Sequence, residues 1–132
     1  MAEPMTYEID GARFSTLEGF FEEVSTVLIP GVEWGRSENA LLDVLRGGFG
    51  TPPDGFTILW RNHRLSRQRL GYPETVRQLE AGLRHCLPES RDNLRRMLQQ
   101  AHAGEGPTVF DSLIEIIRDE EVKAAGVELI LT

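Results

Sequence analysis

Three short β-type segments, separated by long helical stretches, constrain the fold of this chain of 132 residues more than any other feature. They cover residues 6–9, 56–60 and 127–131, and the first of them stops at the turn pair Asp10-Gly11. Strands that are separated by helices pair in parallel, because each connection must cross over the sheet. The sequence therefore predicts an α/β fold with a small three-stranded parallel sheet packed with helices. The mostly apolar segment 56–60 is expected to be covered on both faces.

Capping and turn residues delimit the helical stretches. Ser15 and Glu18 have the spacing of a capping box, which predicts that a helix opens at Ser15. Ser37 is expected to cap a second, short helix, which carries Asp43 between apolar neighbours and stops at Gly47. Further helices are expected over 61–70, 73–86, 90–100 and from Thr108 onward, and the acidic run 119–121 is expected at the end of the last helix.

Composition is typical of a globular protein. Apolar residues make up 40% of the sequence and charged residues 27%, which excludes a disordered chain. No apolar run approaches the roughly 18 residues that cross a bilayer. The N-terminus lacks the features of a signal peptide, and the single Cys86 has no partner for an internal disulfide, so a cytoplasmic location is expected.

Charge is distributed unevenly along the chain. The net charge is −7, from 14 Lys and Arg and 21 Asp and Glu. Residues 1–60 contribute −7, residues 61–96 contribute +5 and residues 97–132 contribute −5. Solvated faces explain such acidity in most proteins, but if the fold joins the two ends, they form one acidic region. The surplus of acid argues against a protein that binds nucleic acid along its phosphates.

No catalytic, metal or cofactor motif stands out. The glycine-rich stretch 47–50 follows no strand and precedes no Lys-Ser/Thr pair, which indicates a helix stop rather than a phosphate loop. His63, His85 and His102 lack metal-ligand spacing with one another or with Cys86. We therefore expect no catalytic residues, no metal and no cofactor, and no small-molecule substrate or membrane partner.

The stretch from Trp34 to Gly47 resembles the signature of the barstar family, intracellular inhibitors of the ribonuclease barnase. Residues 56–61, 112–118 and 127–132 are similar to the family's second strand, last helix and last strand. The middle of the chain looks like the longer form found in actinobacterial relatives. The short sequence motifs at residues 69–72 and 104–111 carry this part of the resemblance. The resemblance implies one barstar-like domain over 1–132, with about 65–107 as an extended helical middle segment. The matching positions of the signature are Trp34, Gly35, Ala40, Leu41, Asp43, Leu45 and Gly47.

The resemblance implies a non-enzymatic inhibitor of a small secreted or toxin ribonuclease, of the extracellular, guanyl-specific type. In this family the second helix and the loop before it plug the nuclease active site, and a critical Asp, which matches Asp43, stands in for substrate phosphate. A carboxylate among fixed cationic groups makes strong charge-assisted hydrogen bonds. Asp119 matches a second acidic contact, and Trp34-Gly35 matches the aromatic-Gly pair of the loop.

Four further candidate nuclease-binding positions depart from the family pattern. Asn39 replaces an Asp that contacts the nuclease, and Glu38 replaces an apolar Leu. Glu33 stands where the family has an aromatic residue, and Phe49 is displaced by one position from the aromatic that follows the helix. These changes imply either a different nuclease specificity or weakened inhibition.

Two other hypotheses remain open. The altered segment 37–39 is compatible with a barstar-like regulatory protein-interaction module that has no nuclease target. The basic middle segment, with Arg64, Arg67 and Arg69 along one expected helix, suggests an enzyme or an RNA binder, whose retention on RNA would depend strongly on salt.

Overall fold

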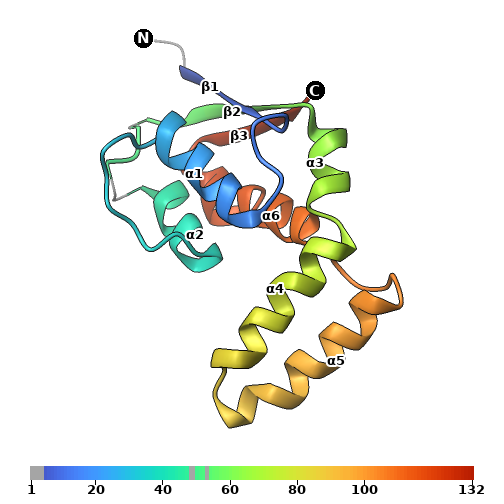
Figure 1. Ribbon diagram of the computed structural model, residues 1–132. Helices are drawn as coiled ribbons and strands as arrows, with labels where there is room; N and C mark the ends of the chain where they lie inside the picture. Colours follow the sequence, from blue (N-terminus) through green and yellow to red (C-terminus); the bar gives the residue numbers. More distant parts are fainter. Residues whose placement is uncertain (1–4, 48–49, 53) are drawn as a thin grey trace.

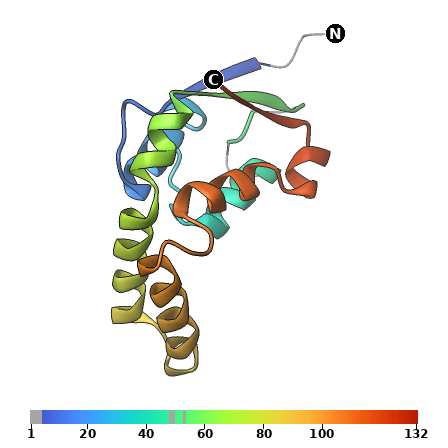
Figure 2. The same cartoon turned by 90° about the vertical axis from the view of Figure 1, so that its right-hand side faces the viewer.

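The computed structural model describes residues 5–47, 50–52 and 54–132, and its helices lie beneath one face of a small sheet (Figures 1 and 2). Both strand pairings are parallel, with Ile9 opposite Trp60 and Trp60 opposite Leu131. The predicted α/β class and three-stranded parallel sheet are therefore confirmed. The strand order is β1-β2-β3, with β1 (Met5–Asp10), β2 (Phe56–Arg61) and β3 (Val127–Leu131).

The helices occur in two groups. α1, α2 and α6 lie beneath the sheet, whereas α4 and α5 form an antiparallel pair that projects away from it, here called the arm (residues 72–102; Figures 1 and 2). α3 joins β2 to the base of the arm. The bounds are α1 (Leu17–Val27), α2 (Glu38–Arg46), α3 (His63–Arg69), α4 (Tyr72–His85), α5 (Arg91–His102), α6 (Val109–Ile117) and α7 (Glu120–Ala124), with a 3₁₀ turn at Pro88–Ser90.

Hydroxyl side chains cap the helices beneath the sheet, but the first cap differs from the expected one. Thr16, rather than Ser15, accepts a hydrogen bond from the backbone N–H of Gly19, at 3.0 Å, and the predicted capping box at Ser15 is wrong. Because Thr16 caps the helix one residue later than expected, Glu18 takes no part in a capping box with Ser15. The Glu18 carboxylate instead pairs with Arg77 of the arm. The predicted N-cap of α2 at Ser37 and the predicted N-cap of α6 at Thr108 are confirmed.

Trp60 of β2 lies at the centre of the core and is fully buried. Its ring stacks on Phe20 of α1 at 5.2 Å between centroids and meets Phe110 of α6 edge to face at 5.3 Å. The indole Nε1 donates a hydrogen bond to the hydroxyl of Ser66 in α3, at 2.9 Å, so its polar atom is satisfied although no water reaches it. One residue thus joins the sheet to three helices.

No helix formed by the described residues lies on the outer face of the sheet, as Figures 1 and 2 show. Burial alternates along β2, where Phe56, Ile58 and Trp60 are buried and the residues between them are half-buried. Ile130 of β3 lies on the outer face and is 47% exposed. The expectation that β2 is covered on both faces is therefore wrong, because all the helices that pack on the sheet do so from one side. Within the described ranges, no helix has the length and apolar character needed to cross a membrane.

Candidate protein-binding site

The short helix α2 turns one side to the core and the other to solvent. Leu41, Val44 and Leu45 are buried. Asn39 and Asp43, which are four residues apart, share the opposite, exposed side. The Asp43 side chain keeps 59% of its accessible surface. Its carboxylate is therefore available to a partner without any rearrangement of the helix.

A groove of about 220 Å³ runs between α2 and α6. The surrounding protein removes water from the Glu38 carboxyl and so raises its pKa, although the residue as a whole is exposed. No Lys or Arg belongs to the described residues that line the groove, and three carboxylates do, so the groove attracts positive charge. The lining residues are Glu38, Leu42, Ser112, Glu115, Ile116 and Asp119.

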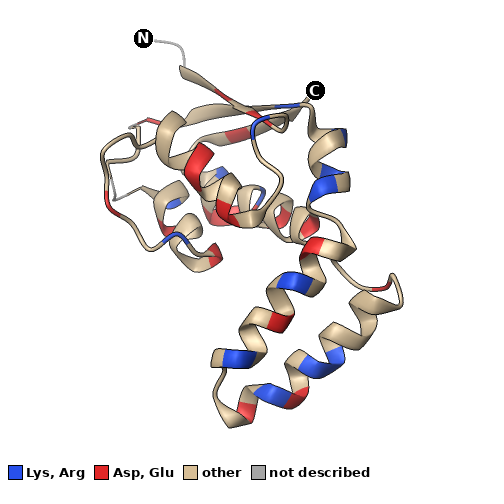
Figure 3. Ribbon diagram, in the orientation of Figure 1, with Lys and Arg blue, Asp and Glu red and all other residues tan. Residues whose placement is uncertain are grey.

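The groove joins the two acidic ends of the sequence. Glu38 comes from the acidic first 60 residues, and Glu115 and Asp119 come from the acidic last 36. The Arg residues of the middle segment lie instead at the end of β2 and along α3, α4 and α5 (Figure 3). The sequence predicted one acidic region on the condition that the fold brings the two acidic ends together. The fold meets this condition.

Asp119 is an N-cap and not the last residue of a helix. α6 ends at Ile117, and the Asp119 carboxylate accepts a hydrogen bond from the N–H of Glu121, at 2.9 Å, to begin α7. The expectation that the acidic run 119–121 closes the last helix is wrong. Because acids stabilise the positive N-terminal end of a helix, this run favours the local structure instead of opposing it.

Arg46, a residue that the sequence analysis did not select, lies among the acids of α2, α6 and α7, here called the acidic surface (Glu38, Asp43, Glu115, Asp119 and Glu121). Its Nε atom is 2.7 Å from a carboxylate oxygen of Glu121, which ties α2 to α7. Its Nη1 atom is 4.0 Å from Asp43. The spacing of three residues between Asp43 and Arg46 is the one sequence signal for this contact, since the Glu121 partner is far away in the chain.

The loop before α2 is fixed to α1 through Trp34. The indole is half-buried, meets Phe21 edge to face at 5.6 Å, and donates a hydrogen bond to the Ser25 hydroxyl at 2.6 Å. Gly35 and Glu33 are exposed in the same loop. Trp34 therefore positions the loop, and only part of its ring faces solvent. Phe49, the remaining candidate, lies outside the described residues.

Two of the three basic residues of α3 act within the chain. Arg69 donates hydrogen bonds to backbone carbonyls in segment 11–14, at 3.1 to 3.3 Å. The Arg67 guanidinium lies over the ring of Phe110, 5.1 Å from its centroid. These contacts hold α3 against the core and leave Arg64 without a similar contact among the described residues. Two of the three guanidinium groups are therefore used in packing contacts within the chain, although all three remain exposed and charged.

Among the described residues, no group of three or more His, Cys, Asp or Glu side chains has a geometry that could hold a metal ion. Glu74 of the arm is the most enclosed of the carboxylates whose pKa is shifted. Burial raises the pKa of Glu74, but hydrogen bonds from Arg77, from the N–H of Leu17 and from Gln78 outweigh it, and the net pKa is lowered. Because all of these partners belong to the chain itself, Glu74 serves to hold the base of the arm in place.

A comparison with known families agrees with this architecture. The family model described as Barstar (barnase inhibitor) matches residues 5–105, which is more than half of the chain. Among curated proteins, no sequence matches the chain. The family match includes β1 to α5, so the assignments of Asn39 and Asp43 fall inside it, whereas Asp119 falls outside it. The chain therefore belongs to the Barstar family, that of the barnase inhibitor.

Proposed function

We propose that this chain is an intracellular inhibitor of a small ribonuclease, whose active site it covers with the surface formed by α2, α6 and α7. The observation that carries the proposal is the exposed carboxylate of Asp43 beside a groove that contains three more carboxylates. Membership of the Barstar family supports the same role. The target expected from the resemblance is an extracellular-type, guanyl-specific enzyme of the barnase kind.

The chemistry of inhibition follows from the charges. A ribonuclease active site holds fixed cationic groups that bind phosphate, and the Asp43 carboxylate offers these groups two oxygen acceptors. When the interface excludes water, such hydrogen bonds become short and strong, because each joins a full negative charge to a full positive one. Asn39, one turn before Asp43, adds a neutral amide that can both donate and accept hydrogen bonds.

Trp34, Gly35 and Glu33 play a different part in the proposal. The loop that they form leads into α2, and the hydrogen bond from Trp34 to Ser25 holds this loop against α1. A fixed loop loses less conformational entropy on binding than a free one. We expect this loop to contact the nuclease beside the active site, with the exposed part of the Trp34 ring as its apolar contact.

The experiment is inhibition of a panel of small microbial ribonucleases by the wild-type chain and by Asp43→Ala. We expect Asp43→Ala to weaken inhibition by about 100-fold or more, because removing one member of a buried charge pair costs about 3–5 kcal/mol. Glu128→Ala on the outer face of the sheet is the matched control, since Glu128 is an exposed acid on β3.

Glu121→Ala is unsuitable as the control. Loss of the Glu121 carboxylate would release Arg46 to pair more closely with Asp43, 4.0 Å away, and would alter the site itself. Equal inhibition by wild type, Asp43→Ala and Glu128→Ala would contradict the proposal that this surface blocks the nuclease.

Arg46 also favours a second candidate function, a regulatory protein-interaction module without a nuclease target. A cation beside Asp43 repels the cationic groups of a nuclease, and it suits a partner surface of mixed charge. Segment 37–39, which departs from the family pattern, begins the same helix. No inhibition across the panel, together with copurification of a partner that lacks nuclease activity, would support this second function over the first.

A further inference from the structure

The arm and the sheet with its other helices, here called the body, enclose a second groove, next to the one between α2 and α6. Its volume is about 180 Å³, and residues of α4 and α5 line it on the side of the arm. Residues of α1, α2 and α6 line it on the side of the body. The arm projects beyond α2 in both views (Figures 1 and 2), and Glu38, the first residue of α2, is among the residues that line the groove.

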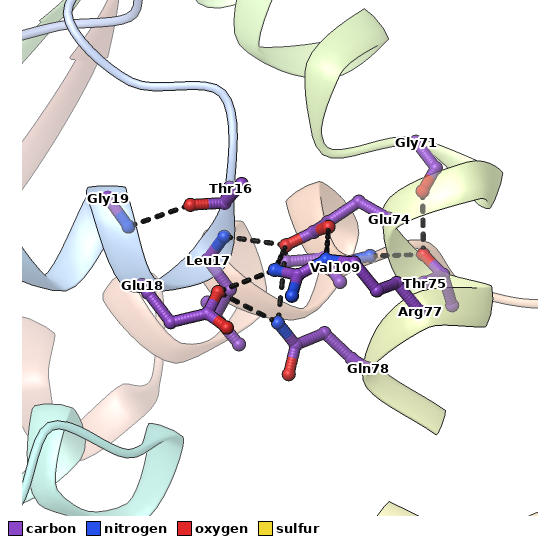
Figure 4. A network of polar contacts seen from close by, with 10 residues as sticks. All are labelled: Thr16, Leu17, Glu18, Gly19, Gly71, Glu74, Thr75, Arg77, Gln78 and Val109. Atoms are coloured by element: carbon purple, nitrogen blue, oxygen red, sulfur yellow. Dashed lines mark hydrogen bonds and ion pairs between the residues drawn. The ribbon is translucent and has the colours of Figure 1, made fainter. Parts of the chain in front are cut away.

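A network of polar contacts fixes the arm to the body (Figure 4). The Glu74 carboxylate accepts a hydrogen bond from the N–H of Leu17, at 2.8 Å, and pairs with Arg77 at 2.6 Å. Arg77 also pairs with Glu18 of α1, at 2.6 Å. The Thr75 hydroxyl accepts a hydrogen bond from the N–H of Val109, at 2.9 Å. The groove therefore exists before any partner binds, and its walls need no ordering.

The lining of this groove combines apolar side chains with acidic residues. Leu17, Leu79 and Met97 are among the apolar lining residues. Glu38 lines the groove from α2 and Glu105 lines it from the loop before α6. In the part of the chain that the structure describes, neither carboxylate forms an ion pair. A long aliphatic chain with a positive end matches this arrangement, because its stem packs on apolar side chains and its charge meets a carboxylate.

The two grooves are neighbours. Glu38 and Ser112 line both of them, so a partner seated between α2 and α6 lies next to the groove at the arm. A protein that is attracted by the acidic face through its own cationic groups brings Lys and Arg side chains to this place. The arm is thus a second wall of the same interface.

We infer that the groove between the arm and the body receives a Lys or Arg side chain from the protein that binds the α2–α6 face. The stem of this side chain lies on Leu79 and Met97, and its charge lies between Glu38 and Glu105. The inference rests on the proposed function, from which it takes the cationic target surface. It makes the arm a determinant of which ribonuclease is bound.

Two variants of the arm test the inference against a ribonuclease that the wild-type chain inhibits. Met97→Lys places a cation in the groove, and we expect it to weaken inhibition about tenfold, by like-charge repulsion and loss of the apolar contact. Gln99→Lys is the matched control. The substitution adds the same charge to α5, but Gln99 is exposed and does not line the groove.

Glu105→Gln removes one carboxylate and keeps the shape of the side chain. We expect about a threefold loss of inhibition, in line with a partly exposed ion pair. Glu89→Gln, at the exposed turn between α4 and α5, should change inhibition by less than this. If Asp43→Ala weakens inhibition while Met97→Lys and Glu105→Gln match their controls, the inference about the groove is wrong and the proposed function stands.

A titration without a nuclease tests the chemistry of the groove directly. In ¹H–¹⁵N spectra, N-acetyl-arginine amide should shift the side-chain amides of Gln78 and Gln100, which line the groove, and the backbone amide of Glu105. N-acetyl-norleucine amide, which has a similar stem without charge, should shift them less. Equal shifts with both probes, or none with the arginine probe, would overturn the inference; no inhibition of any nuclease would instead contradict the proposed function.

Discussion

Arg46 and Glu121 form an ion pair of 2.7 Å that joins α2 to α7 across the acidic surface. The same guanidinium lies 4.0 Å from Asp43, the residue expected to enter a nuclease active site. The surface proposed to bind the nuclease consequently holds a cation of its own, and part of its negative charge is compensated before a partner arrives. The degree of compensation bears on how fast and how strongly a cationic partner binds.

Arg46→Ala should increase the rate of association with a ribonuclease. Removing the positive charge makes the surface around Asp43 more negative, and we expect the rate to rise about threefold at low ionic strength and to return to the wild-type value at high salt. Stopped-flow fluorescence at several salt concentrations measures the rate. The stability cost should stay below about 1 kcal/mol, because the pair is exposed.

Arg64→Ala is the control for the Arg46 prediction. It changes the net charge by the same amount on α3, where Arg64 is exposed and away from the groove. It should leave the association rate close to that of the wild type. Slower association of Arg46→Ala would mean that Arg46 itself contacts the nuclease.

Ser66→Ala should lower stability, because the Ser66 hydroxyl satisfies the buried indole N–H of Trp60 at 2.9 Å. Both residues are fully buried, and an unsatisfied donor in that position costs about 1–3 kcal/mol. Urea unfolding followed by tryptophan fluorescence measures the loss. Ser90→Ala is the matched control, since Ser90 is exposed and makes no side-chain cap, and it should change stability by less than about 0.5 kcal/mol.

Acid should loosen the arm through Glu74. Hydrogen bonds lower the folded-state pKa of Glu74 below its ordinary value of 4.5, so its stabilising effect is complete above that value. The effect is lost as the pH falls through the lowered pKa, because the protonated group no longer pairs with Arg77. Glu18, whose pKa the Arg77 hydrogen bond also lowers, adds to the loss in the same range.

Glu74→Gln tests the acid dependence of the arm. The variant should be less stable than the wild type near neutral pH, by about 1–3 kcal/mol, because a buried charge-assisted contact is lost. Its stability should fall less steeply than that of the wild type below pH 4.5. Hydrogen exchange of the α4 amides measures docking of the arm, and Glu80→Gln, at an exposed position of α4, is the control. Parallel acid profiles for wild type and Glu74→Gln would assign the acid sensitivity to other groups.

The strands and most helix starts could be predicted from the sequence because their signals are local. A β-type run, or a hydroxyl residue before an apolar helical pattern, involves neighbours in the chain, as for Ser37 and Thr108. The start of α1 was misplaced by one residue because Ser15 and Thr16 are both hydroxyl residues. Glu18 pairs with Arg77, which is far away in the chain. The residues next to Glu18 therefore give no sign of this contact in the sequence.

The site was only partly accessible from the sequence. Asp43 on the exposed side of α2 follows from helical spacing and from the resemblance. The ion pair between Arg46 and Glu121, the groove between α2 and α6 and the angle of the arm depend on contacts between residues far apart in the chain. The sequence did not predict that the outer face of the sheet is open. Leu59 on this face is apolar but only half-buried, and residue type alone does not distinguish a half-buried side chain from a buried one.

Asp119 begins α7 as its N-cap, and the proposed function also gives it a contact with the nuclease; two substitutions separate these two roles. Asp119→Ser keeps an oxygen that can accept the hydrogen bond from the N–H of Glu121 and removes the charge, whereas Asp119→Ala removes both. Ser is as good an N-cap as Asp, and loss of a cap costs about 1 kcal/mol, so only Asp119→Ala should lower stability appreciably. Both variants should weaken ribonuclease inhibition to a similar degree, since both leave a nuclease cation without its acidic contact.

The comparison of the two Asp119 variants decides what the carboxylate does. Thermal unfolding gives the stability of each variant, and inhibition assays with the same nuclease give the affinity. If Asp119→Ser inhibits as well as the wild type while Asp119→Ala does not, the residue serves only to begin α7, and Glu38 and Glu115 remain as the acids of the groove. Loss of inhibition with retained stability in Asp119→Ser would instead make the charge at the start of α7 a direct contact, beyond the part of the chain that the family model matches.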